Sequence, residues 1–105
     1  NTLSLEIINT LNEIILDSAK NNAIKVIIIR SVGKIFSAGH NLKEISLHRQ
    51  DGDKGLKFFT TLINSCSKLM LNIINNPKMD YTRKLFSEPE KIINKCVLTN
   101  IIFTA

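Results

Sequence analysis

The amino-acid sequence predicts an α/β fold in which a parallel strand is flanked by helices. Two stretches of the 105-residue chain, 4–21 and 56–75, repeat apolar side chains every three to four positions. This is the period of a helix with one buried face. Between them, residues 24–30 form a short, β-branched and nearly continuous apolar run, which is typical of a strand covered on both faces. Helix, short link and strand in this order make up half of a βαβ unit.

The first helix, expected over 4–21, has suitable residues at both ends. Ser4 can accept a hydrogen bond from the free amides of the first turn. Glu6 lies in that turn, where the helix dipole favours a negative charge. Lys20 and the pair Asn21-Asn22 suit the other end, so the strand over 24–30 is expected to follow a short link.

A loop of small residues follows the strand and is the candidate binding segment. Ser37, Ala38 and Gly39 allow the backbone to approach a ligand closely. A helix is expected to begin next, at His40 or Asn41. Free amides at a helix start attract negatively charged oxygen, so the segment favours an anionic or polarised group.

The second long helix, expected over 56–75, follows a polar loop at 49–55 and is ended by Asn76-Pro77. Beyond this point the pattern changes. Ser87 and Glu90 resemble a capping box at a helix start, and residues 96–102 fit a strand or a helix. We therefore divide the chain into 1–77 and a divergent tail, 78–105.

Composition argues against several function classes. The net charge of +5, from 14 Lys and Arg and 9 Asp and Glu, is spread over both halves, and there is one Tyr and no Trp. This pattern does not favour nucleic-acid binding. The longest apolar run, 26–29, is too short to span a membrane. No metal site is expected, because the pairs Cys66/Cys96 and His40/His48 lack metal-ligand spacing.

The cysteines also bear on location. Cys66 and Cys96 lie among apolar neighbours and indicate free thiols in a reducing compartment. No secretory signal is visible, although the chain begins at Asn1 and a leader could have been removed. A cytoplasmic protein is expected, or a mitochondrial one if the source is eukaryotic.

Three motifs of residues 1–77 resemble the crotonase superfamily, the enoyl-CoA hydratase/isomerase fold. N-T-L-S at 1–4 is similar to the family's N-A-L-S, and 24–30 is similar to its V-x-V-I-I-x-S strand. The most specific match is I-F-S-A-G-H-N-L-K-E at 35–44, against x-F-[CS]-A-G-x-D-L-K-E. Ser37 before Ala-Gly and His40 after it resemble one subgroup of the superfamily. The resemblance implies part of a ββα-repeat fold.

The resemblance also implies a site and a chemistry, that of a lyase of fatty acid metabolism. The residue after Ala-Gly, His40, would supply its backbone N–H to an oxyanion hole for an acyl-CoA thioester, and its imidazole would be a bystander or pocket wall. Ala38, His40, Asn41, Leu42 and Lys43 match the stretch that binds CoA. The thioester is the substrate, and no further cofactor is implied.

Other parts of the family pattern have no counterpart in this sequence. After Asn-Pro-Lys the family continues with a glycine-rich motif that supplies the second oxyanion amide and leads to a catalytic Glu, whereas no glycine follows Gly55. Glu44 is expected to be a surface charge and not the general base. A truncated gene, a frameshift or a partial reading frame would each explain this. An incomplete chain of this kind is expected to be inactive alone, so whether it is an enzyme stays open.

Three hypotheses follow. The first is an acyl-CoA-directed enzyme by descent with an incomplete chain. The second is a non-catalytic remnant, or an acyl-CoA-binding or assembly module; relatives in the family form trimers, and an unpaired apolar strand edge invites self-association. The third is an unrelated small basic α/β domain.

Overall fold

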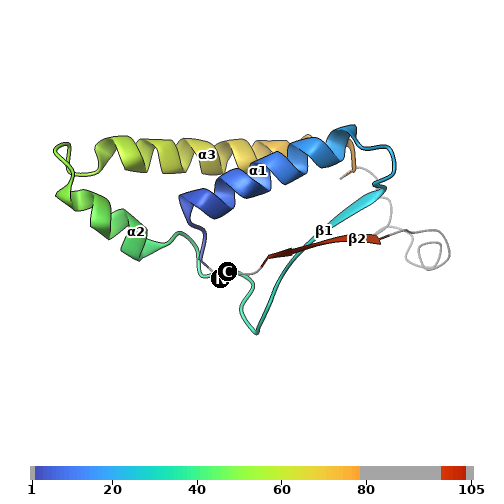
Figure 1. The fold of residues 1–105 in the computed structure, drawn as a ribbon, viewed down its shortest axis with the longest axis horizontal. Helices are drawn as coiled ribbons and strands as arrows, with labels where there is room; N and C mark the ends of the chain where they lie inside the picture. The colour runs from blue at the N-terminus through green and yellow to red at the C-terminus, as the bar shows by residue number, and fades with distance from the viewer. Residues whose placement is uncertain (1, 79–97, 104–105) are drawn as a thin grey trace.

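A computed structural model of the chain describes residues 2–78 and 98–103. Figure 1 shows two long helices side by side and a pair of strands that lies beyond the first of them. The elements in chain order are α1 (Leu5–Lys20), β1 (Val26–Ser31), α2 (Leu42–Leu47), a short 3₁₀ helix (His48–Gln50), α3 (Leu56–Ile74) and β2 (Leu98–Phe103).

The two long helices lie where the apolar period predicts them. α1 begins after Ser4, whose Oγ accepts a hydrogen bond from the Ile7 N–H at 3.2 Å, and it ends at Lys20. α3 ends at Ile74 with Asn75 as its C-cap. Each predicted boundary is thus correct to within one residue, because the caps and the periodicity are local signals.

The start of α3 is built by an aspartate. Asp53 accepts hydrogen bonds from the Gly55 N–H through Oδ1 and from the Lys57 N–H through Oδ2, both at 2.9 Å. The amides of Lys57 and Gly55 lower the pKa of the Asp53 carboxyl, because they stabilise its charged form. Gly55 itself has φ 85°, a left-handed conformation that glycine adopts without strain.

Strand β1 begins later than the expected 24–30. Asn21 accepts two hydrogen bonds, one through its side-chain Oδ1 from the Ala23 N–H at 2.9 Å and one through its backbone carbonyl from the Ile24 N–H at 3.1 Å. A turn therefore occupies the expected start of the strand. β1 pairs in parallel with β2, with Val26 opposite Leu98. One parallel neighbour of β1 therefore comes from 78–105, where no family motif was found. The predicted helix start at 87–90 lies outside the described residues.

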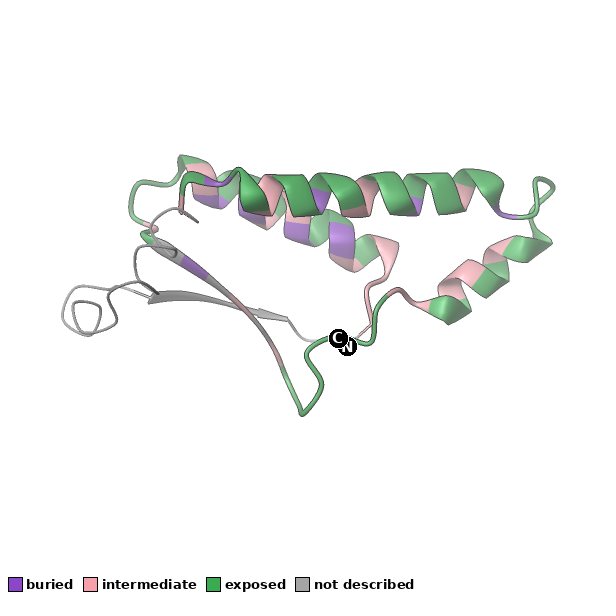
Figure 2. Cartoon of the chain, turned by 180° about the vertical axis from the view of Figure 1, so that it is seen from behind, coloured by how far each residue is buried: buried purple, intermediate pink, exposed green. Residues whose placement is uncertain are grey.

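The core lies between α1, α3 and β1. Its buried apolar residues are Ile8, Leu11 and Ile15 of α1, Ile27 of β1, and Leu62 and Leu69 of α3. Burial of each of these side chains contributes about 1.5–3 kcal/mol. Figure 2 shows the buried positions gathered where α1 and α3 face each other. The described residues are thus mostly helical. Both long helices lie on one side of the strand pair (Figure 1), which is only part of the α/β arrangement expected.

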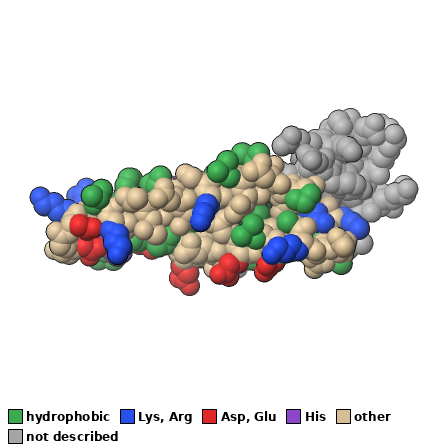
Figure 3. Space-filling view, turned by 90° about the horizontal axis from the view of Figure 1, so that it is seen from above, with side chains coloured by type: hydrophobic (Ala, Val, Ile, Leu, Met, Phe, Trp, Pro, Cys, Tyr) green, Lys and Arg blue, Asp and Glu red, His purple; other side chains and the backbone are tan. Residues whose placement is uncertain are grey.

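Large apolar side chains also remain exposed. On α3 they include Leu56, Phe59, Ile63, Met70 and Ile74, between 38% and 67% exposed. At 100° per residue these five positions fall within one narrow arc of the helix. Figure 3 shows apolar side chains on the surface among polar and charged ones. Among the described residues this face of α3 carries no covering layer.

Candidate functional site

The predicted binding loop is joined to the N-terminal segment by backbone hydrogen bonds. The Leu3 N–H donates to the Gly39 carbonyl at 2.8 Å, and the Asn41 N–H donates to the Leu3 carbonyl at 3.1 Å. The two bonds form an isolated parallel bridge between Leu3 and His40. Residues 3 and 40 are thus brought together by tertiary structure.

This bridge determines the direction of the His40 amide. The peptide bonds are trans, so the carbonyl and the N–H of one peptide plane point in opposite directions. Because the Gly39 carbonyl points at Leu3, the His40 N–H of the same plane points away from Leu3. None of the hydrogen bonds between described residues uses this N–H. The donor that the sequence singled out is therefore unengaged in the part of the chain that the structure covers.

The turn before this amide depends on glycine. Gly39 has φ 83°, and a Cβ built on it would meet no heavy atom within 4 Å. Its requirement for glycine is therefore conformational and not a matter of crowding. The Gly39 N–H is not used in the bridge and donates a hydrogen bond to Ser37 Oγ at 3.1 Å.

The imidazole of His40 lies in a different environment from its amide. The residue is half-buried, and Nδ1 is shielded from solvent and has no hydrogen-bond partner among the described residues. An acid-base histidine is usually oriented by a carboxylate or carbonyl on this nitrogen. The described residues provide no such group, and the role of the ring as a pocket wall stays a prediction.

Asn41 and not His40 caps the helix that follows. Asn41 Oδ1 accepts from the Lys43 N–H at 3.1 Å and from the Glu44 N–H at 3.3 Å, and Leu42 is the first residue of α2. The helix therefore begins slightly later than the expected His40 or Asn41, because Asn41 is used as the cap. The other predicted site residues, Ala38, Leu42 and Lys43, are exposed.

The expectation that Glu44 is a surface charge is wrong. Glu44 is half-buried, and its Oε2 accepts a hydrogen bond from the Leu5 N–H at 3.1 Å. Leu5 is the first residue of α1, where unsatisfied amides and the helix dipole favour a carboxylate. Sequence reasoning missed this contact because residues 5 and 44 carry no shared local pattern.

A pocket of about 420 Å³ lies at the corner between α2 and α3. Its lining residues are His48, Asp51, Gly52, Asp53, Lys57, Phe58 and Thr61. His48 Nδ1 lies 2.7 Å from Asp51 Oδ2, and the imidazole stacks on the Phe58 ring with centroids 3.7 Å apart. The pocket belongs to the expected polar loop at 49–55 and not to the loop that carries the His40 amide.

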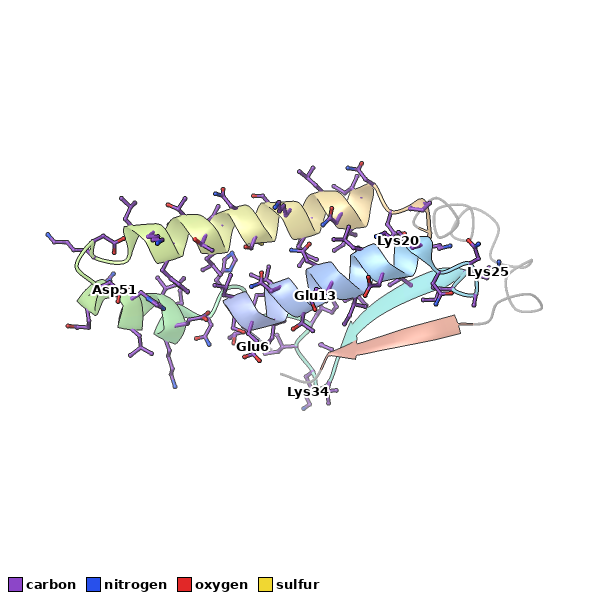
Figure 4. The ribbon with its side chains drawn as sticks, turned by 45° about the horizontal axis from the view of Figure 1, so that its top comes forward. Glu6, Glu13, Lys20, Lys25, Lys34 and Asp51 are labelled. Carbon is purple, nitrogen blue, oxygen red and sulfur yellow. The ribbon has the colours of Figure 1, made fainter. Side chains whose placement is uncertain are left out.

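The charged side chains are spread along the chain, although Asp51, Asp53 and Lys57 line the pocket. Figure 4 shows the basic residues Lys20, Lys25 and Lys34 at the end of α1, before β1 and in the loop after β1. Within residues 2–78 and 98–103, no three His, Cys, Asp or Glu side chains gather as a metal site. No helix in that part of the chain has the length and hydropathy to cross a membrane.

The chain is similar to known proteins over its first 78 residues. A model of the enoyl-CoA hydratase/isomerase family matches residues 1–78. The chain is similar to enoyl-CoA hydratase domain-containing protein 3, mitochondrial, of Homo sapiens, at 39% identity over 77 residues, or 73% of this chain and 24% of that protein. The Danio rerio protein of the same name is 40% identical over 77 residues, covering 73% of this chain and 25% of that protein. No solved structure matches.

These relatives confirm the subgroup indicated by Ser37 and His40 in the motif. The chain spans about a quarter of the length of the curated relatives that it matches. The matched region contains α1, β1, α2, α3 and the loop with the His40 amide. By sequence and by motif, the chain belongs to the enoyl-CoA hydratase/isomerase family.

Proposed function

We propose that this chain provides one oxyanion donor, the His40 N–H, for the carbonyl oxygen of an acyl-CoA thioester. The observation that carries the proposal is the direction of that amide: in the bridge it points away from Leu3, and no hydrogen bond between the described residues uses it. Membership of the enoyl-CoA hydratase/isomerase family supports the choice of ligand.

The chemistry follows from the charge that a thioester develops. When a nucleophile adds to the β-carbon, or a proton leaves the α-carbon, negative charge accumulates on the thioester oxygen. A fixed N–H aimed at that oxygen stabilises the enolate, and removal of one such donor typically slows a reaction by about 10²–10³. The exposed residues Ala38, Leu42 and Lys43, with Asn41, are proposed to contact CoA, which is the leaving or carrier group of the substrate and not a separate cofactor.

Turnover needs more groups than this site supplies. Glu44 is hydrogen-bonded to the Leu5 amide, and both carboxylate oxygens of Asp53 accept backbone amides. We propose that both serve as helix caps and not as the general base, a group that contributes about 10²–10⁴ in rate. We therefore propose that the chain by itself binds an acyl-CoA weakly and does not hydrate it.

A proline at position 40 removes the backbone N–H, and comparison with alanine separates this loss from loss of the imidazole. Both bonds of the bridge use groups that survive His40→Pro, the Gly39 carbonyl and the Asn41 N–H. His40→Ala retains the amide and removes the imidazole. Amide NMR of ¹⁵N-labelled chain titrated with crotonyl-CoA is expected to show a shift of the residue-40 amide in wild type and in His40→Ala, and at least tenfold weaker binding in His40→Pro.

The outcomes are distinct. Binding by His40→Pro and His40→Ala that is as tight as by wild type contradicts the role of the amide. Loss of binding in both assigns the contact to the imidazole instead. The Leu3 amide resonance monitors whether the bridge itself is intact in each variant.

Assembly is the second candidate function, favoured by the exposed apolar arc of Leu56, Phe59, Ile63, Met70 and Ile74 on α3. In this alternative the chain packs against another polypeptide, and the full ββα-repeat α/β fold is completed only there. Sedimentation of the purified chain over a concentration series tests self-association. The names of the relatives state a mitochondrial location, and we propose the same compartment for this chain.

A further inference from the structure

Three hydrogen bonds hold the N-terminal segment to the start of α2. Two are the bridge bonds of Leu3 with Gly39 and Asn41, and the third joins the Leu5 N–H to Glu44 Oε2. Leu3 and Leu5 are separated by Ser4 alone, so the third bond fixes the segment that makes the first two. We call this set of three bonds the clamp.

Glu44 is itself placed by the same loop. Its N–H donates to Asn41 Oδ1 at 3.3 Å, and the next amide, of Ile45, donates to the Asn41 carbonyl at 3.2 Å. The Glu44 carboxylate then reaches the amide end of α1, where it meets a favourable dipole. The clamp therefore closes a loop of contacts from Asn41 through Glu44 and Leu5 to Leu3, and back to Asn41.

The peptide plane between Gly39 and His40 needs this support. Gly39 sits at φ 83°, and glycine has more rotational freedom than any other residue. A Cβ built on it would meet no heavy atom within 4 Å, and the bond from its N–H to Ser37 Oγ holds the preceding peptide plane and not this one. The direction of the His40 N–H is therefore held by the Leu3 hydrogen bond to the Gly39 carbonyl and not by local sterics.

We infer that Glu44 is a positioning residue for the His40 amide, acting through Leu5 and Leu3. The inference rests on the proposed function for its purpose but not for its geometry. Glu44 touches no substrate in this scheme. It restricts the rotation of a glycine-flanked peptide so that the donor is aimed before a thioester arrives, which is the condition for effective oxyanion stabilisation.

The test removes each of two caps of α1, Glu44 and Ser4, in separate variants. Glu44→Ala deletes the carboxylate of the clamp, whereas Glu44→Gln keeps an oxygen acceptor. Ser4→Ala is the matched control, because Ser4 Oγ caps the same helix at the Ile7 N–H without reaching α2. If Glu44 only stabilises α1, the alanine variants at 44 and 4 behave alike.

Hydrogen exchange of single amides is the first readout and needs no ligand. In Glu44→Ala the Leu3 and Asn41 amides are expected to exchange about tenfold faster, the ratio for loss of a hydrogen bond to a charged acceptor. Ser4→Ala is expected to speed exchange within the first turn of α1 and to leave those two amides unchanged. Glu44→Gln should recover most of the protection. Equal exchange of Leu3 and Asn41 in wild type and Glu44→Ala overturns the inference.

Leu5→Pro removes the same bond from its donor side and serves if Glu44→Ala does not fold. Proline suits the first position of a helix, and Ser4 already has the extended conformation, φ −80° and ψ 164°, that a residue before proline requires. Leu5→Pro should speed exchange of Leu3 and Asn41 as Glu44→Ala does. Unchanged exchange in this variant contradicts the clamp.

Binding of crotonyl-CoA gives the second readout, with CoA as the comparison ligand. Glu44→Ala is expected to reduce the crotonyl-CoA shift of the His40 amide at least fivefold, with little change in CoA affinity, and Ser4→Ala to leave both unchanged. A full shift in Glu44→Ala overturns the positioning role. Absence of the shift in wild type refutes the proposed function instead, and the exchange data then decide the clamp separately.

Discussion

Asn76 offers the sharpest test of how the two long helices are held together. The residue is 4% exposed, and its Nδ2 donates to the Ile15 carbonyl at 3.0 Å and to Ser18 Oγ at 3.4 Å. Its Oδ1 accepts from the Lys78 N–H at 2.9 Å. The amide thus joins the end of α3 to the last turns of α1, and both of its polar atoms are used.

Asn76→Asp keeps the size of the side chain and replaces a donor with an acceptor. The new oxygen faces the Ile15 carbonyl and the Ser18 hydroxyl, and the charge is buried without a basic partner among the described contacts. An uncompensated buried charge costs about 3–5 kcal/mol. Asn76→Ala removes the same bonds without adding a charge and should cost about 1–2 kcal/mol.

Urea unfolding followed by far-UV circular dichroism measures both losses. Burial raises the pKa of the introduced carboxyl, so its destabilisation is present above that pKa and falls as acid protonates the group and restores a donor. The loss in Asn76→Asp should therefore be smaller at pH 4 than at pH 7. Asn75→Asp, at the exposed neighbouring position, is the control. A loss at pH 7 within about 0.5 kcal/mol of that control, the range of ordinary surface changes, would refute the reasoning.

Three further predictions concern glycine strain, an acidic cap and the core. Gly39→Ala should lower the unfolding free energy by about 1–2 kcal/mol, because alanine is strained in the left-handed conformation. Gly55→Ala should cost clearly more, because its Cβ would also meet the His48 carbonyl oxygen at 2.9 Å. Urea unfolding of the two variants checks this order. Because the pKa of Asp53 is lowered, its charged cap stabilises α3 at pH values above the ordinary pKa of 3.8, and this stabilisation is lost as the pH falls through the pKa in the folded state. Helicity measured between pH 6 and 2 should show this loss in wild type and not in Asp53→Asn. Leu62→Ala, at a fully buried position, should lower the free energy of unfolding by about 3 kcal/mol, measured by thermal or urea unfolding. Leu56→Ala, on the exposed side, should cost less than about 0.5 kcal/mol. Equal losses would mean that the two faces of α3 are misassigned.

The sequence by itself predicted the elements that depend on local signals. The boundaries of α1 and α3 follow from apolar spacing and from neighbours such as Ser4, and these act over a few residues. The motif at 35–44 identified the loop, the approximate start of α2 and the family, because a run of specified residue types is itself local information.

The tertiary structure alone decided the contacts between distant residues. The Leu3 bridge to His40, the Glu44 bond to Leu5 and the Asn76 bonds to Ile15 and Ser18 join positions 37 to 61 residues apart. No periodicity or capping pattern encodes such pairs, since each depends on how the helices pack. Glu44 was misjudged for this reason: a glutamate early in a short helix usually faces water, and here the packing of α1 supplies a free amide that binds its carboxylate.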